Sequence, residues 1–184
     1  FEWVSDTLRH VGTVVHRWLQ RMADDELSGW DVTRIEGLRQ AFRRELAARG
    51  VAEAELAQAV TRVRAALVNA LDDPRGRWLL GPQRDGRNEM RITCRLPGGA
   101  GAVASVATVV IDRSFRDAEG RTWIVDYKTS HHEGTGVEAF LDREQVRYRE
   151  QLQRYALALA APEASLGLYF PLLRGWREWG AGGA

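Results

Sequence analysis

The sequence predicts an α/β fold, with a central β-sheet flanked by helices and a helical insertion after the first helix. Apolar residues recur every three or four positions over residues 3–22 and 142–161, which indicates amphipathic helices. The segments between them include β-branched runs and alternating patterns, which indicate strands. A second helical pattern, over residues 31–71, interrupts this series and is the expected insertion.

The first helix has a glycine, Gly12, at its centre. An interior glycine costs roughly 1 kcal/mol relative to alanine, so we expect another side chain or backbone to come close to it. His16 lies one turn further along the same side. A helix histidine is ordinarily hydrogen-bonded in or near the core, and this helix alone assigns His16 no function.

The insertion contains two apolar stripes separated by Gly50, which predicts a helical hairpin that ends before Pro74 and serves as scaffold or lid. Residues 75–82 are expected to form a connector. Residues 89–96 then alternate between apolar and polar and predict a half-buried strand. Its polar face, which begins with Glu89, is either plain solvent surface or looks toward an acidic site and a phosphate backbone.

The central stretch, residues 108–129, predicts a β-hairpin because two β-branched runs flank a segment of Asp, Ala, Glu and Gly. Side chains alternate along a strand, so Asp126 and Lys128 share a face. If the loop is centred near Glu119, Asp112 falls opposite Asp126, where cross-strand Cβ atoms lie roughly 4.5–5.5 Å apart. Two carboxylates this close require a cation between them.

Lys128 is the single lysine among the 26 lysine and arginine residues of the chain. A solvated ion pair with the two acids is one interpretation of this cluster. The compositional exception favours chemistry instead, because the compact ammonium has an adjustable pKa that the guanidinium of arginine lacks.

The last helix is expected to begin at Asp142, with Gln145 completing a capping box, and to end at Pro162. Residues 165–172 predict a final strand, and the glycine-rich end after Trp179 is expected to fray. The neighbouring histidines, His131 and His132, could suggest a metal site. We interpret them as part of an exposed loop, since adjacent side chains in a strand point in opposite directions.

Composition places the 184 residues with globular proteins of one domain, in which 45% of residues are hydrophobic and 28% charged. A net charge of +1 does not by itself indicate a nucleic-acid partner. One stretch is locally basic, however, and contains Arg75, Arg77, Arg84, Arg87, Arg91 and Arg95. The one cysteine, Cys94, forms neither an internal disulfide nor an iron–sulfur site and fits a reducing cytoplasm. No secretory pattern or membrane-length apolar run is present, and the initial Phe1 suggests a piece of a longer protein.

Five sequence elements stand out in order along the chain: Gly12-Thr13-Val14-Val15-His16, Glu89, Ile111-Asp112-Arg113, Val125-Asp126-Tyr127-Lys128-Thr129 and Gln151-Leu152-Gln153-Arg154-Tyr155. In this order they resemble the motif series of the RecB-like nucleases, a branch of the PD-(D/E)XK superfamily. This family is found as the C-terminal nuclease domain of bacterial helicase-nucleases of the exonuclease V and AddAB type, and the resemblance covers nearly the whole chain. Val109 replaces a glycine that is frequent in the family, and the cysteines of its iron–sulfur subgroup are absent.

The resemblance implies one nuclease domain over residues 1–184, with a mixed sheet and an insertion at about 31–71. It implies that His16, Asp112, Asp126 and the backbone carbonyl of Tyr127 bind a divalent metal, with Glu89 as a possible additional ligand. It makes Lys128 catalytic, together with Asp112 and Asp126, and assigns Gln151, Tyr155 and Arg113 to bracing the site or to contacting DNA.

An oxygen-rich ligand set suits Mg²⁺ or Mn²⁺, and the expected reaction is phosphodiester hydrolysis. The resemblance implies exonucleolytic processing of DNA ends in recombinational repair, in the cytoplasm and without a membrane partner. The expected partners are DNA, a helicase motor domain of the same parent chain and a second helicase-nuclease subunit. No phosphate-binding loop occurs in this sequence, so the motor lies outside it. The alternatives are an inactive DNA-binding domain of the same fold and a metal-binding interaction domain without nuclease chemistry.

Overall fold

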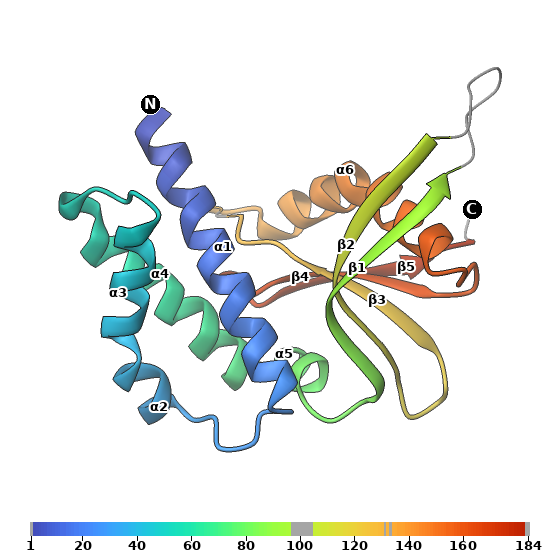
Figure 1. The fold of residues 1–184 in the computed structure, drawn as a ribbon, viewed down its shortest axis with the longest axis horizontal. Coiled ribbons are helices and arrows are strands. Elements are labelled where there is room, and N and C mark those ends of the chain that lie inside the picture. Colours follow the sequence, from blue (N-terminus) through green and yellow to red (C-terminus); the bar gives the residue numbers. More distant parts are fainter. Residues whose placement is uncertain (1, 97–104, 131, 133, 183–184) are drawn as a thin grey trace. The chain divides into compact units, whose positions relative to one another are not determined.

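The computed structural model describes residues 2–96, 105–130, 132 and 134–182. In the described residues, the elements follow one another as α1 (Glu2–Asp24), α2 (Val32–Gly37), α3 (Arg39–Ala48), α4 (Glu53–Asp72), α5 (Pro74–Leu80), β1 (Arg84–Leu96), β2 (Ser105–Arg116), β3 (Thr122–Tyr127), α6 (Val137–Ala158), β4 (Ser165–Phe170) and β5 (Gly175–Gly180) (Figure 1). The strands of this part of the chain form one mixed, five-stranded sheet in the order β1-β2-β3-β4-β5. The predicted α/β fold class is confirmed.

The chain divides into two compact units. Unit 1 comprises Phe1–Pro82, Tyr127–Glu133 and Phe170–Gly175. Unit 2 comprises Gln83–Asp126, Gly134–Tyr169 and Trp176–Ala184. Unit 1 therefore holds helices α1 to α5, and unit 2 holds α6 and most of the sheet.

The core of unit 1 is formed by the apolar stripes that the sequence predicts. Helix α1 packs on α3, α4 and α5. Its apolar face is buried from Val11 to Ala23, and Trp18 meets Phe42 of α3 edge to face with ring centroids 5.3 Å apart. Ile35, Leu46 and Leu67 are also completely buried. The expected helical insertion is present, as α2, α3 and α4.

The core of unit 2 lies between the antiparallel strands and α6, which packs on β1 and β2. Strands β1 and β2 pair antiparallel along most of their length, and Figure 1 shows them extending together as a two-stranded ribbon. The alternation predicted from residue 89 onward is observed, since Met90, Ile92 and Cys94 are half-buried while Arg91 and Thr93 are exposed. The strand begins at Arg84, earlier than expected.

Several helices also differ from the sequence-based prediction. The first half of the insertion breaks at Leu38 into two short helices, and residues 74–80 form a helix whose N-cap, Asp73, accepts from the backbone N–H of Arg75. Helix α6 begins at Val137, not at Asp142. The Asp142 carboxylate accepts from Arg177 Nε at 2.8 Å, so it forms a tertiary ion pair instead of a cap.

The C-terminal segment contains a strand that the sequence analysis did not predict. Residues 175–180 form strand β5, and the fraying expected after Trp179 stays a prediction, because residues 183–184 lie outside the described residues. A Cβ on Gly167 of β4 would lie 2.2 Å from the Trp176 ring, so the glycine makes room for this tryptophan. The Trp176 ring also lies 5.9 Å from the ring of Trp123. Among the described residues, no helix combines the length and apolar character that crossing a membrane requires.

Candidate active site

The hairpin register brings three carboxylates of unit 2 into one row across neighbouring strands. The β2–β3 ladder runs from Arg116↔Thr122 to Arg113↔Val125, and the next residues on the two strands are Asp112 and Asp126. On the other side of β2, the pairs Asn88↔Arg113 and Met90↔Ile111 flank Glu89 and Asp112. Glu89, Asp112 and Asp126 therefore form what we call the acidic row.

The acidic row concentrates negative charge in a largely buried place. Carboxylate oxygens of Glu89 and Asp112 lie within 4.8 Å of each other. The exposed fractions of Asp112 and Asp126 are 8% and 4%, whereas Glu89 is exposed. Carboxylates this close repel each other, and burial strengthens the repulsion, so the arrangement favours a bound cation.

The backbone at Glu89 has a φ of 46°, in the left-handed region, although the residue lies inside a β-strand. Residues other than glycine adopt this region at an energetic cost, and such residues cluster at functional sites. Asp85 of the same strand also has a left-handed φ, of 51°, so the angle at Glu89 belongs to an irregular first half of β1 and does not by itself single out the acidic row.

Tyr155 and Gln151 of α6 lie beside the acidic row. The Gln151 side-chain amide donates to the Tyr155 hydroxyl, one helical turn away. Burial and then the negative charge of Asp126 raise the pKa of Tyr155 to about 12, with a smaller contribution from Asp112, while the Gln151 hydrogen bond acts in the opposite direction. Tyr155 is therefore a protonated hydroxyl donor over the whole physiological pH range.

Unit 1 holds three further residues of the predicted site, which are His16, Tyr127 and Lys128. His16 is half-buried on α1, and its ring meets Tyr127 edge to face with centroids 5.9 Å apart. A Cβ on Gly12 would lie 2.8 Å from the Thr129 hydroxyl, which confirms the close approach expected at this glycine. Lys128 lies between these two contacts in the sequence and is half-buried. Helix α1 thus packs against the segment that directly follows Asp126.

Arg113 points away from the acidic row. Only 2% of the residue is exposed, its Nη1 donates to Asn88 Oδ1 at 2.9 Å, and its guanidinium lies 5.4 Å from the centre of the Phe115 ring. A Cβ on Gly86 would come within 3.2 Å of the same guanidinium. This environment is that of a structural arginine.

Asp117, at the start of the hairpin turn, has a role that the sequence did not reveal. It is 1% exposed and accepts three hydrogen bonds, from the backbone N–H and Nε of Arg121 and from Trp123 Nε1, at 2.8 to 2.9 Å. These donors outweigh its burial and hold the pKa of the Asp117 carboxyl below its usual value. An acidic residue before a turn was the available signal, but only the fold brings Trp123 to it.

Two residues of the predicted histidine loop, His131 and Glu133, lie outside the described residues. The prediction of the loop as exposed and unrelated to metal binding stays a prediction.

The fold and the acidic row define an α/β protein whose antiparallel strands present carboxylate oxygens, the ligands that divalent cations such as Mg²⁺ prefer. The model of the PD-(D/E)XK nuclease superfamily matches residues 4–172, and the chain belongs to this superfamily. The crystal structure of SSO0001 is similar at 15% sequence identity with a TM-score of 0.40, and the match covers 88% of this chain and 75% of that one. No match was found among the curated proteins.

Proposed function

We propose that this protein hydrolyses DNA phosphodiester bonds in a reaction that requires a divalent metal ion. The observation that carries the proposal is the acidic row, in which Glu89, Asp112 and Asp126 occupy the same position on three neighbouring strands. Lys128 follows two residues after the last of them, as the Asp-x-Lys spacing of the superfamily requires.

The residues present fit Mg²⁺ or Mn²⁺. Two buried carboxylates and an exposed one supply hard oxygen ligands, and a divalent cation offsets their mutual repulsion. In the proposed site Asp112 and Asp126 are the main ligands and Glu89 an additional one. His16 and the backbone carbonyl of Tyr127 complete the set by the family resemblance, and the packing of the His16 ring on Tyr127 supports their pairing.

The bound metal would supply Lewis-acid stabilisation of the phosphoryl oxygens and an attacking water of lowered pKa. The chain's own residues do the rest. Lys128 orients the attacking water through its ammonium and offsets charge on the scissile phosphate. Tyr155, held protonated and fixed by Gln151, donates a hydrogen bond toward the acidic row or toward a phosphate oxygen. Because Arg113 is buried on other partners, we leave it out of the proposed DNA interface.

The finer assignment rests on the resemblance to RecB-like nucleases. We propose one nuclease domain over residues 1–184, with residues 31–71 as its insertion, that acts on DNA ends during recombinational repair in the cytoplasm. The pairing of Gln151 with Tyr155 on α6 supports this branch, since the two residues match its Gln-x-x-x-Tyr element. A helicase motor in the parent chain, and a second helicase-nuclease subunit, would feed the strand to the site.

The second candidate is an inactive DNA-binding domain of the same fold. Such a domain no longer needs its ligands or its lysine, and loss of at least one of them is expected. This sequence keeps Asp112, Asp126 and Lys128 together, which favours the active enzyme.

The direct test incubates the protein with linear single-stranded and double-stranded DNA in Mg²⁺, in Mn²⁺ and in chelator. We expect cleavage with either ion and none in chelator. Asp112→Asn and Asp126→Asn should each abolish cleavage, because each removes a charged ligand while preserving side-chain volume.

The matched control is Asp142→Asn, which makes the same change at an exposed ion pair of α6 and should cleave like the parent. Equal cleavage in chelator would exclude the metal assignment. Binding of DNA without any cleavage, in every ion, would support the inactive domain instead.

A further inference from the structure

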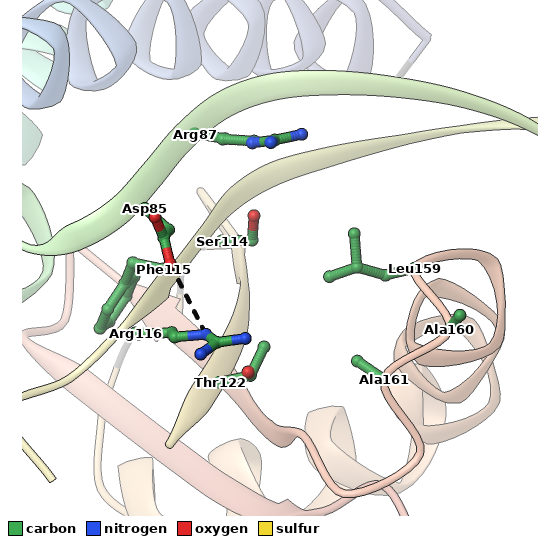
Figure 2. A pocket seen from close by; sticks show the side chains of 9 residues that line it. All are labelled: Asp85, Arg87, Ser114, Phe115, Arg116, Thr122, Leu159, Ala160 and Ala161. Atoms are coloured by element: carbon green, nitrogen blue, oxygen red, sulfur yellow. Dashed lines mark ion pairs between the residues drawn. The ribbon is translucent and has the colours of Figure 1, made fainter. Parts of the chain in front are cut away.

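A cavity of about 510 Å³ lies wholly within unit 2, between the β2–β3 hairpin and the end of α6 (Figure 2). Its volume lies in the range of small-ligand sites. Arg87, Ser114 and Arg116 line its strand side, and residues 159–161 line its helix side. The proposed hydrolysis gives none of these residues a role, so the cavity requires an explanation of its own.

The strand side of the cavity carries an excess of positive charge. Arg116 pairs across the strands with Arg84, so two like charges face each other, and both residues are exposed. Arg116 Nε lies 3.6 Å from the Asp85 carboxylate, the ion pair drawn in Figure 2. The Arg84 side chain forms no hydrogen bond or ion pair with any described residue. The Arg87 guanidinium contacts Met90 Sδ at 3.8 Å, which is a weak acceptor. The carboxylate of Asp85 therefore stands against three guanidinium groups, which favours an anionic ligand.

The helix side of the cavity is apolar and has an unusual backbone. Helix α6 ends in a Schellman motif, in which the N–H of Ala161 donates to the carbonyl of Ala156 and the N–H of Ala160 to that of Leu157. Ala160 occupies the left-handed position of this motif with a φ of 53°, where glycine is the usual residue because it lacks a Cβ. The methyl group of Ala160 therefore costs conformational energy, and it forms part of the cavity wall. The alanine is explained if its methyl group contacts a bound ligand.

The cavity suits neither a nucleobase nor an added β-strand. Among the described lining residues the one aromatic ring is that of Phe115, which is only 2% exposed and has the Arg113 guanidinium over it at 5.4 Å. Bases bind by stacking on exposed aromatic faces, and this lining offers none. The edge of β1 is irregular here, because Asp85 has a left-handed φ and the register shifts between Arg84 and Arg87. A strand cannot pair along such an edge, so the ligand contacts side chains.

We propose that this cavity binds the C-terminus of a partner protein whose last residue is apolar and is preceded by acidic residues. The last residue of a chain is the one residue that carries a carboxylate and an apolar side chain on the same Cα atom. Its carboxylate binds Arg87 and the Ser114 hydroxyl. Its side chain packs on Leu159 and Ala160. The acidic side chains before it pair with Arg84 at the rim of the cavity.

The orientation of the peptide follows from electrostatics. The C-terminal end of a helix carries partial negative charge and unpaired carbonyl groups, so it repels a carboxylate and accepts hydrogen bonds from peptide N–H groups. The carboxylate of the partner therefore faces the strand side, and its apolar side chain faces the end of α6. The proposal does not depend on the proposed nuclease activity, because no residue of the acidic row lines the cavity.

The test measures the fluorescence anisotropy of a labelled peptide, fluorescein-Gly-Asp-Asp-Asp-Leu with a free carboxyl end, in chelator. The same peptide with an amidated end lacks the terminal charge and should bind at least about tenfold more weakly. Arg87→Gln should weaken binding of the free-acid peptide by a similar factor and should leave the amidated peptide unaffected. The matched control is Arg44→Gln, at an exposed arginine of α3, which should change neither affinity.

Ala160→Gly separates contact with the peptide from folding. Glycine suits the left-handed position, so the variant should melt at a higher temperature than the parent. Loss of one methyl contact should nevertheless weaken binding of the free-acid peptide about fourfold. DNA cleavage by Ala160→Gly and by Arg87→Gln should match that of the parent, since neither residue belongs to the proposed active site.

Equal binding of the free-acid and amidated peptides, or equal binding by the parent and Arg87→Gln, overturns the proposal. So does the absence of saturable binding up to about 1 mM peptide. A labelled oligothymidylate in chelator tests the other macromolecule: if both variants weaken its binding and leave peptide binding unchanged, the cavity is a nucleic-acid site and the proposal is wrong. If the protein cleaves no DNA but binds the free-acid peptide through Arg87, the nuclease function fails and this proposal stands.

Discussion

Gly12 of α1 lies directly against Thr129, so closely that a Cβ on the glycine would stand 2.8 Å from the threonine hydroxyl. Both residues belong to unit 1, and His16 contacts Tyr127 one helical turn further on. The two contacts hold α1 against the segment that contains Lys128. An interior glycine that weakens the helix is thus explained by the position of the lysine-bearing segment.

Gly12→Ala is expected to destabilise the fold, although alanine is the better helix former by about 1 kcal/mol. The new methyl group overlaps the Thr129 hydroxyl, and overpacking of this kind typically costs about 1–3 kcal/mol. Chemical denaturation should show that Gly12→Ala lowers the free energy of unfolding by a net amount on the order of 1 kcal/mol.

Thr129→Ala provides the control, because it removes the clashing hydroxyl. In the Thr129→Ala background, Gly12→Ala should stabilise by about 1 kcal/mol through helix propensity alone. If Gly12→Ala destabilises the protein equally in both backgrounds, a clash with the Thr129 hydroxyl does not cause the destabilisation.

Lys128→Arg is expected to slow DNA cleavage at least a hundredfold, which is about 2.7 kcal/mol of barrier. The guanidinium keeps the charge but is larger, directs its donors in a fixed plane and stays protonated near neutral pH. Single-turnover cleavage measures the chemical step, and thermal melting with and without Mn²⁺ checks that fold and metal binding persist.

The matched control for Lys128→Arg is Arg143→Lys, a reverse exchange at an exposed position of α6, which should not change the rate. If Lys128→Arg cleaves DNA at a rate within a few-fold of the parent rate, Lys128 is a structural ion-pair partner and has no catalytic role.

Glu89→Gln is expected to stabilise the protein in chelator and to weaken its response to metal. Its carboxylate lies within 4.8 Å of the Asp112 carboxylate, and like charges at this distance repel by about 1 kcal/mol in water-like surroundings. Melting curves are recorded for the parent and for Glu89→Gln in chelator and in Mn²⁺. The variant should have a higher melting midpoint than the parent in chelator, and its midpoint should rise less than that of the parent when Mn²⁺ is added.

Glu163→Gln serves as its control, since it removes an exposed carboxylate from the α6–β4 loop and should shift neither midpoint. A lower midpoint for Glu89→Gln in chelator would show that Glu89 stabilises the free protein and does not repel Asp112.

Asp117→Asn is expected to destabilise the hairpin at neutral pH, by about 1–3 kcal/mol, because an amide cannot accept all three hydrogen bonds of the buried carboxylate. The folded-state pKa of Asp117 lies below its usual value of 3.8, so the carboxylate contributes stability above that pH. This contribution falls as the pH drops through the lower folded-state pKa.

Urea denaturation between pH 2 and 7 measures the free energy of unfolding of the parent and of Asp117→Asn. The difference between the two proteins should be largest near neutral pH and should vanish in acid. Trp123→Phe removes one of the three donors. Its difference from the parent in the free energy of unfolding should therefore be smaller than that of Asp117→Asn and should decrease over the same acidic range. A stability difference between parent and Asp117→Asn that does not depend on pH would exclude the charge of the Asp117 carboxylate as its cause.

Local signals in the sequence predict the hairpin, its register and the facing positions of Asp112 and Asp126, whereas they leave open whether Glu89 joins these two acids. The side-chain repeat of a strand is two residues and a short turn sets the pairing, so a loop centred near Glu119 already places Asp112 across from Asp126. The stripes of α1 and α4 and the close approach at Gly12 were also predictable, because a helical period and an unfavourable interior glycine are local signals.

Tertiary contacts determine which faces of the helices and strands are covered and which residues cover them. The sequence cannot tell whether Arg113 reaches solvent or folds over Phe115, since the answer depends on Asn88, which is 25 residues away. Nor does it show that Asp142 pairs with Arg177 instead of capping α6, or that Leu159 closes a cavity over Ser114. These outcomes depend on contacts between segments distant in the chain, and the burial that many such contacts share outweighs a single capping preference of about 1 kcal/mol.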